Sequence, residues 1–469
     1  MKADFGVIGL AVMGQNLALN VESRGYTVAV YNRTRARTEQ FMEEKGEGRN
    51  LIPTYSLPEF VASLSEPRKI ILMVKAGSPT DTVLEQLFPL LSAHDIVIDG
   101  GNAHYPDTER RIELAKEYDL RYLGVGISGG EEGALHGPAI MAGGDKEGYD
   151  QVKQILTKIA AVGPDGPCRA YFGPGSAGHY VKMVHNGIEY AIMETIAEAY
   201  DLMLRGLNMS AREMADAFEG WNGGELSSYL FEISEEILRR VDPETGKPLV
   251  DLILDEAAQK GTGKWSTQGA LDIGSPTPTI AMAVFARIIS ALKEERVQAS
   301  VVLSGPDGNI DADRDKFLRD LLGSVQITVI SAYAQGFRQL QDASRERGYS
   351  LDLAEVARVW MAGCIIRARS LTQMAHAFRD APDLPLLFLA SPFKEIWEKG
   401  HVGLRRVVGQ AHASGIPVPA IDSAIDFLDA YRSSRLPANM IQAQRDFFGA
   451  HTYKRVDREG VFHTKWEEG

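Results

Sequence analysis

Phe5-Gly6-Val7-Ile8-Gly9-Leu10-Ala11-Val12-Met13-Gly14 decides the fold of the first part of the chain. Residues 5–9 form an apolar run typical of a buried strand, and residues 15–25 carry apolar side chains at helical spacing. Gly9 and Gly14 occupy the outer positions of the pattern G-x-G-x-x-G where the strand turns into the helix, with Ala11 in the middle position. Such a turn aims free helical N–H groups at a pyrophosphate, so we predict a dinucleotide site here.

Short apolar runs alternate with amphipathic segments through residues 1–176. This alternation is typical of a parallel sheet covered by helices, and it favours the dinucleotide interpretation over a purely structural turn at Gly9. Most of the runs end in Gly, Asn or Asp, as strands do when they deliver loops to a ligand. The predicted strands are residues 5–9, 27–31, 70–74, 96–99 and 122–126, and the predicted helices include 15–25 and 108–118. We therefore predict an α/β domain of the Rossmann type at residues 1–176.

The end of the second predicted strand distinguishes the two nicotinamide cofactors. An NAD site has Asp or Glu there to bind the ribose 2′-hydroxyl, whereas this chain has Asn32-Arg33-Thr34. Arg33 can pair with a 2′-phosphate and stack on the adenine, and Thr34 can donate a hydroxyl, so we predict NADP. The alternative is that Arg33 is an ordinary solvated loop cation. The predicted cofactor-binding residues are Gly9, Leu10, Ala11, Val12, Met13, Gly14, Asn32, Arg33, Thr34, Val74, Lys75, Ala76 and Asn102.

The spacing of apolar residues changes after Gly173-Pro174-Gly175-Ser176 to every three or four positions, which is the spacing of helices. Residues 178–205 form one uninterrupted helical pattern that stops at Gly206. Further helices are predicted near residues 226–240, 279–296, 316–345 and 351–369, and one more begins at the capping box Ser210-x-x-Glu213. From Leu436 the sequence turns irregular, aromatic and charged, so we expect an arm that lies on another surface rather than folding on itself. The predicted domains after residue 176 are an all-helical domain at 177–434 and a tail at 435–469.

Composition excludes several classes of partner. The 469 residues have room for two or three domains, and the formal net charge is −13. A nucleic acid or an anionic membrane would need a basic patch, and the sequence has no long Lys/Arg block. Cys168 and Cys364 are the only cysteines and lack metal-ligand spacing, so we predict neither a disulfide framework nor a metal site. No apolar signal region precedes the first strand, and we expect a cytoplasmic protein without membrane spans.

Five polar residues of the long predicted helix share one face. Lys182, His185, Asn186, Glu189 and Tyr190 fall at positions i, i+3, i+4, i+7 and i+8. The face is unsuited to a core, and an ordinary solvated face with charge pairs is the alternative interpretation. Asn186 and its neighbour Gly187 are poor helix formers that cost up to about 1 kcal/mol each, which suggests close approach by a ligand or another segment.

Six segments together carry a resemblance to a known family. They are residues 9–17 (GLAVMGQNL), 99–102 (DGGN), 128–134 (SGGEEGA), 182–190 (KMVHNGIEY), 260–265 (KGTGKW) and 444–451 (QRDFFGAH). Along essentially its full length, the chain resembles the decarboxylating 6-phosphogluconate dehydrogenases of the pentose phosphate pathway. The triplet at 128–130 is shared by the wider β-hydroxyacid dehydrogenases, but the full set in this order is specific. The chain departs from the family at Ala191-Ile192, where Gly-Asp is usual, and at Ala142, where proline is expected.

The resemblance implies oxidation of 6-phospho-D-gluconate by NADP, with loss of carbon dioxide and formation of ribulose 5-phosphate. It implies that Lys182 is the general base at the C3 hydroxyl and that Glu189 is the acid that protonates C1 of the enediol. These roles require the pKa of Lys182 to fall well below about 10.4 and the pKa of Glu189 to rise. The resemblance implies that the carboxylate and hydroxyls of the substrate are bound by Asn102, Ser128, Gly129, Gly130, His185 and Asn186. It implies that the phosphate is bound by Tyr190, Lys260, Thr262, Arg287, Arg445 and His451.

The resemblance also implies a homodimer, in which Arg445 and His451 of the tail complete the site of the partner subunit. Two other functions stay open at this stage. A β-hydroxyacid dehydrogenase that stops at the ketone would share Lys182 but would need neither Glu189 nor a phosphate site. A catalytically silent NADP-binding homologue would have no reason to keep both Lys182 and Glu189.

Overall fold

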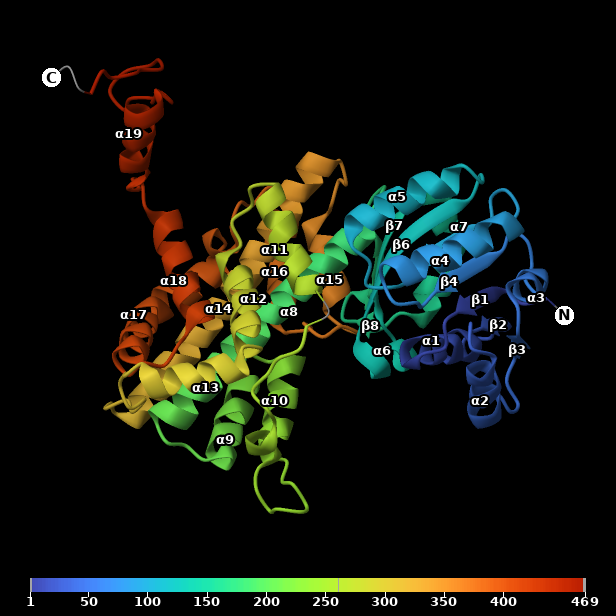
Figure 1. Ribbon diagram of the computed structural model, residues 1–469, viewed down its shortest axis with the longest axis horizontal. Coiled ribbons are helices and arrows are strands. Elements are labelled where there is room, and N and C mark those ends of the chain that lie inside the picture. Colours follow the sequence, from blue (N-terminus) through green and yellow to red (C-terminus); the bar gives the residue numbers. More distant parts are fainter. Residues whose placement is uncertain (1, 260, 467–469) are drawn as a thin grey trace.

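The computed structural model describes residues 2–259 and 261–466, which form a sheet-containing part, a larger helical part and a C-terminal arm (Figure 1). The predicted fold class is confirmed, because a mostly parallel sheet of the Rossmann type precedes a large array of helices. The last strand of the sheet ends at Tyr171, and the first long helix begins at Ala177. The domain boundaries themselves stay a prediction.

One eight-stranded sheet runs through the first part in the order β10-β7-β6-β5-β4-β1-β2-β3. Neighbouring strands are parallel except β6 and β7, which are antiparallel. The strands are β1 (Phe5–Ile8), β2 (Val28–Tyr31), β3 (Leu51–Thr54), β4 (Lys69–Leu72), β5 (Ile96–Asp99), β6 (Arg121–Ser128), β7 (Ala139–Gly144) and β10 (Arg169–Tyr171). A separate pair consists of β8 (Val162–Gly163) and β9 (Gly166–Pro167).

The predicted strands correspond to β1, β2, β4, β5 and β6, whereas the sequence analysis missed β3, β7 and β10. Each missed strand has a weak pattern of its own. Pro53 interrupts β3, two glycines end β7, and β10 has only three residues. Their positions are determined by pairing with neighbouring strands rather than by local sequence.

Helices cover both faces of the sheet. Apolar side chains of α1 and α7 pack on one face, and those of α3 and α4 pack on the other. The helices of this part are α1 (Val12–Ser23), α2 (Arg35–Lys45), α3 (Leu57–Ala62), α4 (Ser78–Leu87), α5 (Tyr105–Lys116), α6 (Gly130–His136) and α7 (Lys146–Ile159). The predicted helices at 15–25 and 108–118 are α1 and α5, and both begin three residues earlier than predicted.

The long helix α8 (Ala177–Asp201) lies at the centre of the molecule, in contact with the sheet and with several helices of the second part (Figure 1). The helices of the second part that precede the arm are α9 (Ala211–Asn222), α10 (Tyr229–Arg239), α11 (Thr262–Asp272), α12 (Pro278–Ser290), α13 (Lys293–Val302), α14 (Arg314–Arg347), α15 (Leu353–Trp360), α16 (Ser370–Asp380), α17 (Ser391–Ala413) and α18 (Pro419–Arg432). The capping box of Ser210 and Glu213 is present at the start of α9, as predicted. Among the described helices, none combines the length and apolar character needed to cross a membrane.

Two helix predictions in this part are wrong. The predicted helix at 279–296 is broken after Ser290, and a second helix starts at Lys293. The predicted helix at 351–369 ends at Trp360, because the chain turns there to meet the sheet. Gly363 has φ +66° and its carbonyl accepts a hydrogen bond from Ala139 N–H at 2.7 Å. The prediction for 178–205 holds as α8 up to Asp201, after which Leu202–Gly206 form a π-helical turn.

The tail differs from the prediction of an irregular arm that does not fold on itself. Its first half is the helix α19 (Ala438–Gly449), and the following segment turns back to pair Tyr453 with Phe462. Side-chain contacts between α19 and this segment supply the structure that composition alone does not indicate. The arm projects from the rest of the molecule (Figure 1).

Candidate active site

The amino-terminal half of α8 lies directly against β6 and β7, because glycines on both sides remove the side chains that would separate them. A Cβ atom on Gly143 would lie 2.4 Å from the backbone nitrogen of Gly178, and one on Gly124 would lie 2.8 Å from the His179 ring. His179 is also hydrogen-bonded to Thr108 Oγ1 at 2.7 Å. The polar face of α8 is therefore held at the carboxyl end of β6, beside Ser128.

Lys182, at the centre of this face, is 6% exposed. Its Nζ donates to Asn186 Oδ1 at 2.8 Å and to Ser128 Oγ at 3.1 Å. His185 completes the group, with Nε2 at 3.2 Å from Ser128 Oγ and Nδ1 at 3.0 Å from Asn186 Oδ1. A neutral imidazole can donate from Nδ1 and accept at Nε2, so the four side chains form a closed hydrogen-bonded circuit.

Burial is the main cause of the pKa shifts of Lys182 and His185. It lowers the pKa of Lys182 below its ordinary value, although the nearby carboxylate of Glu189 acts in the opposite direction. Burial, followed by the positive charge of Lys182, lowers the pKa of His185 well below its usual value. The interpretation of this face as an ordinary solvated surface is therefore wrong, because Lys182, His185 and Asn186 are all buried.

Glu189 lies one turn after His185 on α8. Its side chain is 22% exposed, and its Oε2 lies 3.8 Å from His185 Nδ1. Burial raises the pKa of this carboxyl, while the charges of Lys182 and Arg287 oppose the rise. The two groups thus shift in the directions that the proposed base and acid require. A lysine that loses its proton more readily and a carboxyl that keeps it can exchange protons with one bound molecule.

The weak helix formers on α8 coincide with close contact by another segment, as the sequence analysis suggests. A Cβ atom on Gly187 would lie 2.4 Å from Ser266 Oγ of α11. Asn186 uses its side-chain oxygen to bind Lys182. Gly187 is a poor helix former, but it allows α8 and α11 to come close together. Asn186 is also a poor helix former, but it gives Lys182 an additional hydrogen-bond acceptor.

Three predicted phosphate ligands lie beyond Glu189. The Arg287 guanidinium stacks on the Tyr190 ring with its carbon 3.4 Å from the ring centroid. Thr262 is buried in the first turn of α11, directly after Gly261, which has φ +93°. A guanidinium, a phenol and a hydroxyl at a helix N-terminus suit an anion. The predicted ligand Lys260 lies outside the described residues.

Loops at the carboxyl ends of β5 and β6 carry the remaining predicted substrate ligands. Asn102 is exposed in the turn after β5. Ser128 ends β6, and Gly129 follows with φ +111°, a conformation that favours glycine. A Cβ atom on Gly129 would lie 2.6 Å from the Gly363 carbonyl oxygen, so the loop has no room for a side chain. Gly130 starts α6 and is exposed.

The turn between β1 and α1 has the shape of a dinucleotide cradle. Gly9 has φ +99°, and a Cβ atom there would lie 2.5 Å from the Met73 carbonyl oxygen. A Cβ atom on Gly14 would lie 1.8 Å from the Gly9 carbonyl oxygen. α1 begins after the exposed Ala11 without a side-chain cap, which leaves its first N–H groups free for a pyrophosphate.

The neighbouring loops fit the same ligand. Asn32 Oδ1 accepts the Leu10 N–H at 3.1 Å and so fixes the turn. Arg33 is exposed and, among residues 2–259 and 261–466, has no hydrogen-bond or ion-pair partner. Thr34 precedes α2 and is also exposed. The remaining predicted cofactor contacts, Val74, Lys75 and Ala76, follow β4, which pairs with β1. Within the described part of the chain, no cluster of three or more His, Cys, Asp or Glu residues could hold a metal ion.

Comparison with known proteins decides the family. Residues 4–173 match the family model described as the NAD binding domain of 6-phosphogluconate dehydrogenase. Residues 178–466 match the model described as 6-phosphogluconate dehydrogenase, C-terminal domain. The chain belongs to the 6-phosphogluconate dehydrogenase family.

Relatives in this family are similar over their whole length. The NADP(+)-dependent, decarboxylating 6-phosphogluconate dehydrogenase of Bacillus subtilis (strain 168) is 52% identical over 466 residues, which cover 99% of either chain. The decarboxylating 6-phosphogluconate dehydrogenase of Escherichia coli (strain K12) is 53% identical, also over 99% of either chain. The structure of Plasmodium falciparum 6-phosphogluconate dehydrogenase, described as apo and in complex with its cofactor NADP+ and its substrate 6-phosphogluconate, superposes with a TM-score of 0.95. That protein is 44% identical, and the match covers 99% of this chain and 100% of the other.

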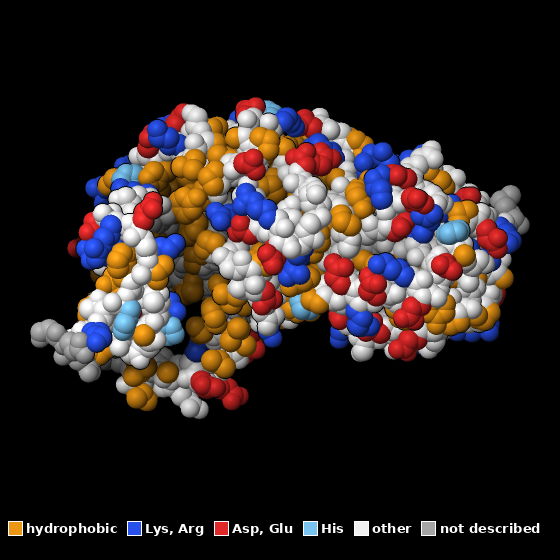
Figure 2. Space-filling model, turned by 90° about the horizontal axis from the view of Figure 1, so that it is seen from above, with side chains coloured by type: hydrophobic (Ala, Val, Ile, Leu, Met, Phe, Trp, Pro, Cys, Tyr) orange, Lys and Arg blue, Asp and Glu red, His pale blue; other side chains and the backbone are white. Residues whose placement is uncertain are grey.

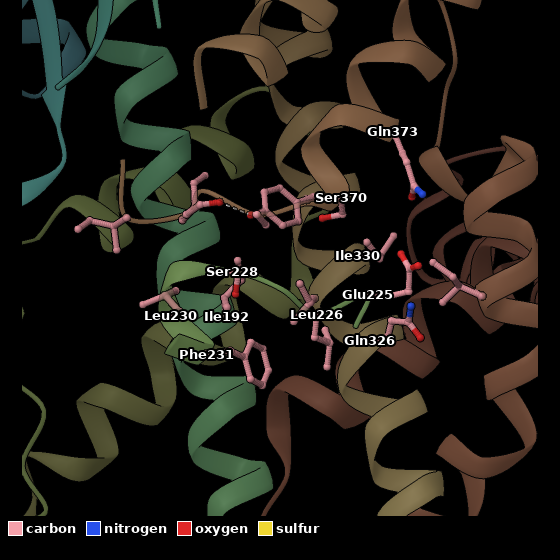
Figure 3. Close-up of a pocket in the computed structure, with 16 residues that line it drawn as sticks. Ile192, Glu225, Leu226, Ser228, Leu230, Phe231, Gln326, Ile330, Ser370 and Gln373 are labelled. Atoms are coloured by element: carbon pink, nitrogen blue, oxygen red, sulfur yellow. Dashed lines mark hydrogen bonds between the residues drawn. The ribbon is translucent and has the colours of Figure 1, made fainter. Parts of the chain in front are cut away.

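The residues at which the chain departs from the usual family pattern, Ala142, Ala191 and Ile192, are all buried. Ala142 is fully buried in β7, and Ile192 is 3% exposed. Ile192 lines a cavity of about 20 Å³, which has room for one water molecule. In Figure 3 Ile192, Leu230 and Phe231 gather on one side of this cavity, opposite the polar Glu225 and Gln326. Neither Lys182 nor Glu189 lines this cavity, so it is separate from the candidate active site.

Two aromatic residues that were not among the predicted site residues connect the loop after β5 to α11, beside the candidate active site. His104, at the start of α5, stacks on Trp265 of α11 with ring centroids 4.8 Å apart and an interplanar angle of 19°. Asn102 lies two residues before His104, and Thr262 lies three residues before Trp265. The only signal in the sequence is that Trp265 ends the segment of family resemblance at 260–265 and that His104 lies two residues after the one at 99–102.

The structure does not bring the tail ligands to the candidate site of the same chain. Arg445 and His451 are exposed on the projecting arm, where Arg445 donates to Gln442 Oε1 at 3.2 Å (Figure 1). Their predicted role therefore depends on a second subunit of this 6-phosphogluconate dehydrogenase family member.

Proposed function

We propose that the chain catalyses the NADP-dependent oxidative decarboxylation of 6-phospho-D-gluconate to D-ribulose 5-phosphate and carbon dioxide. The observation that carries this proposal is the buried Lys182, which lies on the same helical face as Glu189 and is held by Ser128 Oγ and Asn186 Oδ1. The pKa shifts, downward for Lys182 and upward for Glu189, agree with it. The names of relatives that are 52% and 53% identical support the same substrate and reaction.

Neutral Lys182 accepts the proton of the substrate's C3 hydroxyl in this proposal. Bound NADP supplies a hydride acceptor for C3, and its place is the cradle at Gly9 and Gly14. Ser128 and Asn186 accept hydrogen bonds from Lys182 Nζ, so they hold the amine in position. Burial lowers the pKa of His185 and keeps it neutral, so it adds no competing positive charge.

Loss of the carboxyl group from the resulting β-keto acid leaves electrons on C2 and on the C3 oxygen. Lys182, now carrying the proton, donates a hydrogen bond to that developing enolate oxygen. Glu189 then delivers its proton to the carbon that becomes C1 of ribulose 5-phosphate. The raised pKa of Glu189 keeps this proton available, and the burial of Lys182 keeps water away from the amine.

The charge of the substrate matches the arrangement of ligands. Its phosphate carries about −2 at neutral pH, and Arg287, Tyr190, Thr262 and Lys260 are proposed to bind it. The carboxylate and hydroxyl groups are proposed to meet Asn102, Ser128, Gly129, Gly130, His185 and Asn186. A chain with formal net charge −13 thereby gathers positive groups in one place.

The two alternative functions are less well supported. A dehydrogenase that stops at the ketone needs no acid with a raised pKa and no stacked guanidinium beyond it. A silent NADP-binding homologue needs no buried lysine, which costs stability when it is charged. One assay separates all three functions: purified protein is given NADP and 6-phosphogluconate, and NADPH and carbon dioxide are both measured. Equal amounts of the two products support the proposal, NADPH alone supports the ketone-forming enzyme, and neither product supports the silent homologue.

We also propose a homodimer in which the tail of one subunit brings Arg445 and His451 to the site of its partner. Exposed apolar side chains support a second subunit. Phe448 on α19 is 72% exposed and Phe285 on α12 is 54% exposed. Hydrophobic side chains gather on the helical part more than on the sheet-containing part (Figure 2).

Truncation tests the role of the tail. A chain that ends at Leu436 is expected to bind NADP normally and to lose turnover of 6-phosphogluconate. Cofactor binding is measured by calorimetry and turnover by NADPH absorbance. Full turnover by this truncated chain would exclude the proposed role of Arg445 and His451.

A further inference from the structure

The arm folds around one buried carboxylate. Asp446 is 0% exposed although it belongs to a helix that projects from the molecule. Its Oδ1 accepts hydrogen bonds at 3.0 Å from Thr452 N–H and at 3.0 Å from His463 Nδ1. Its Oδ2 accepts at 3.0 Å from Thr464 N–H and at 2.9 Å from Trp466 Nε1. Both oxygens are therefore used twice, which matches the capacity of an ionised carboxylate.

The donors lie far along the chain from Asp446, at separations of 6, 17, 18 and 20 residues. The carboxylate therefore joins the end of α19 to both ends of the segment that follows it. Backbone hydrogen bonds at 2.8 Å in both directions between Tyr453 and Phe462 close the same segment. Burial opposes the ionised form, but the hydrogen bonds outweigh it and lower the pKa of Asp446 to about 2.

The arrangement acts on the two residues that are proposed to reach the partner. Arg445 precedes Asp446, and His451 precedes Thr452, which donates to Asp446. Ala450 and Thr452, on either side of His451, have φ +49° and +58°. These left-handed conformations cost about 1 kcal/mol or more each for residues other than glycine. The hydrogen bond from Thr452 N–H holds one of them in place and so fixes the direction of His451.

We propose that Asp446 is the positioning residue that presents Arg445 and His451 to the site of the partner subunit. The inference rests on the proposed function and adds a residue to which neither the family resemblance nor the comparisons assign a role. The arm projects from the body of its own chain (Figure 1). The hydrogen bonds of Asp446 therefore determine mainly the shape of the arm itself.

Replacement of Asp446 is the first test. Asp446→Ala and the isosteric Asp446→Asn are expected to lower kcat/KM for 6-phosphogluconate by about 100-fold, the effect of misplacing binding groups by about 1 Å. The KM for NADP and the elution volume of the dimer are expected to stay unchanged. Trp466 fluorescence is expected to shift, since its indole N–H loses its partner. Asp457→Ala is the matched control, because Asp457 pairs only with Arg455 among the described residues of the same arm. Unchanged kcat/KM in both Asp446 variants would overturn the inference.

Hybrid dimers separate positioning in the partner from a structural role. The Asp446→Ala chain and a Lys182→Ala chain are given different affinity tags, coexpressed and purified as mixed dimers. The Lys182→Ala homodimer is expected to be inactive, and the Asp446→Ala homodimer is expected to keep about one hundredth of the wild-type kcat/KM. The mixed dimer has one site with an intact lysine and an intact partner arm. About half of the wild-type activity per dimer is therefore expected. An inactive mixed dimer would contradict the inference. An active Lys182→Ala homodimer would instead contradict the proposed function, so the two failures are distinguishable.

Discussion

Gly126 of β6 and Lys182 of α8 touch so closely that a Cβ atom on residue 126 would lie 2.3 Å from Cβ of the lysine. The sheet therefore fixes where the stem of Lys182 begins, and Ser128, two residues further along the same strand, binds its amine. One strand thus sets both ends of a buried lysine side chain.

Gly126→Ala is expected to displace Lys182 and to lower kcat by about 10- to 100-fold, the effect of moving a reacting group by about 1 Å. It is also expected to lower the free energy of unfolding by about 1–3 kcal/mol, the cost of overpacking. The KM for NADP should change little, since Gly126 lies away from the turn at Gly9. Steady-state kinetics and thermal unfolding measure the two effects. Gly409→Ala is the control, because no atom lies within 4 Å of a Cβ atom built there. A Gly126→Ala enzyme with normal kcat would show that the position of α8 tolerates the shift.

The dependence of kcat on pH should be bell-shaped. In the proposed mechanism Lys182 acts as the neutral amine and its pKa is lowered from 10.5, so the rate rises with pH on the acid side. The proposed acid Glu189 acts in its protonated form and its pKa is raised from 4.5, so the rate falls again on the alkaline side. The apparent pKa values belong to the interacting pair rather than to either residue alone.

Glu189→Gln tests this coupling. The carboxylate of Glu189 raises the pKa of Lys182, so its removal should shift the acid side of the profile to lower pH. The maximal kcat should fall by about 10²- to 10⁴-fold, the usual contribution of a general acid. The exposed Glu132→Gln is the control. An acid side that stays in place in Glu189→Gln would show that the two groups do not interact.

Arg33→Ala should weaken selection of NADP over NAD. Loss of hydrogen bonds to a charged phosphate costs about 1.5–3 kcal/mol, which corresponds to a rise of about 10- to 100-fold in the KM for NADP. The KM for NAD should change little. Arg35→Ala is the control, because Arg35 is engaged with Glu39 at 2.8 Å and stacks on Tyr55. Equal effects on both cofactors would contradict a contact with the 2′-phosphate.

His104→Ala should raise the KM for 6-phosphogluconate by about 2- to 10-fold, since an aromatic pair contributes about 0.5–1.5 kcal/mol. The stack on Trp265 connects the turn of Asn102 to the start of α11, and its loss leaves kcat nearly unchanged. His104→Phe keeps an aromatic ring and should restore the KM. If His104→Phe behaves like His104→Ala, the imidazole rather than the stack is what matters.

Local patterns predicted the parts of the site that a single segment determines. The strand, turn and helix at Gly9 and Gly14 follow from glycine positions and hydrophobic spacing. The polar face of α8 follows from helical periodicity, because Lys182 and Glu189 are seven residues apart. Their chemical roles came from resemblance to a family rather than from spacing.

Contacts between distant segments could not be predicted in this way. The burial of His185 depends on elements from both parts of the chain, and the break near Gly363 depends on pairing with Ala139. Asp446 looked like one more charged residue of an irregular tail, because its four donors come later in the sequence. Periodicity reports which face of an element is apolar but not what covers that face.

α8 is in close contact with the sheet, with α11 and with α14. Besides its contacts with the sheet, a Cβ atom on Gly263 of α11 would lie 2.4 Å from the Tyr190 ring, and one on Gly336 of α14 would lie 2.5 Å from Ile188. Because glycines of these neighbouring elements lie so close to α8, the helix has no room to move as a whole when a substrate binds. The proposed proton-transfer groups are therefore aligned once, during folding, and not anew in each turnover. Under the proposed function, adaptation to a bound sugar acid depends on side-chain rotation and on segments that do not contact α8, such as the proposed arm of a second subunit.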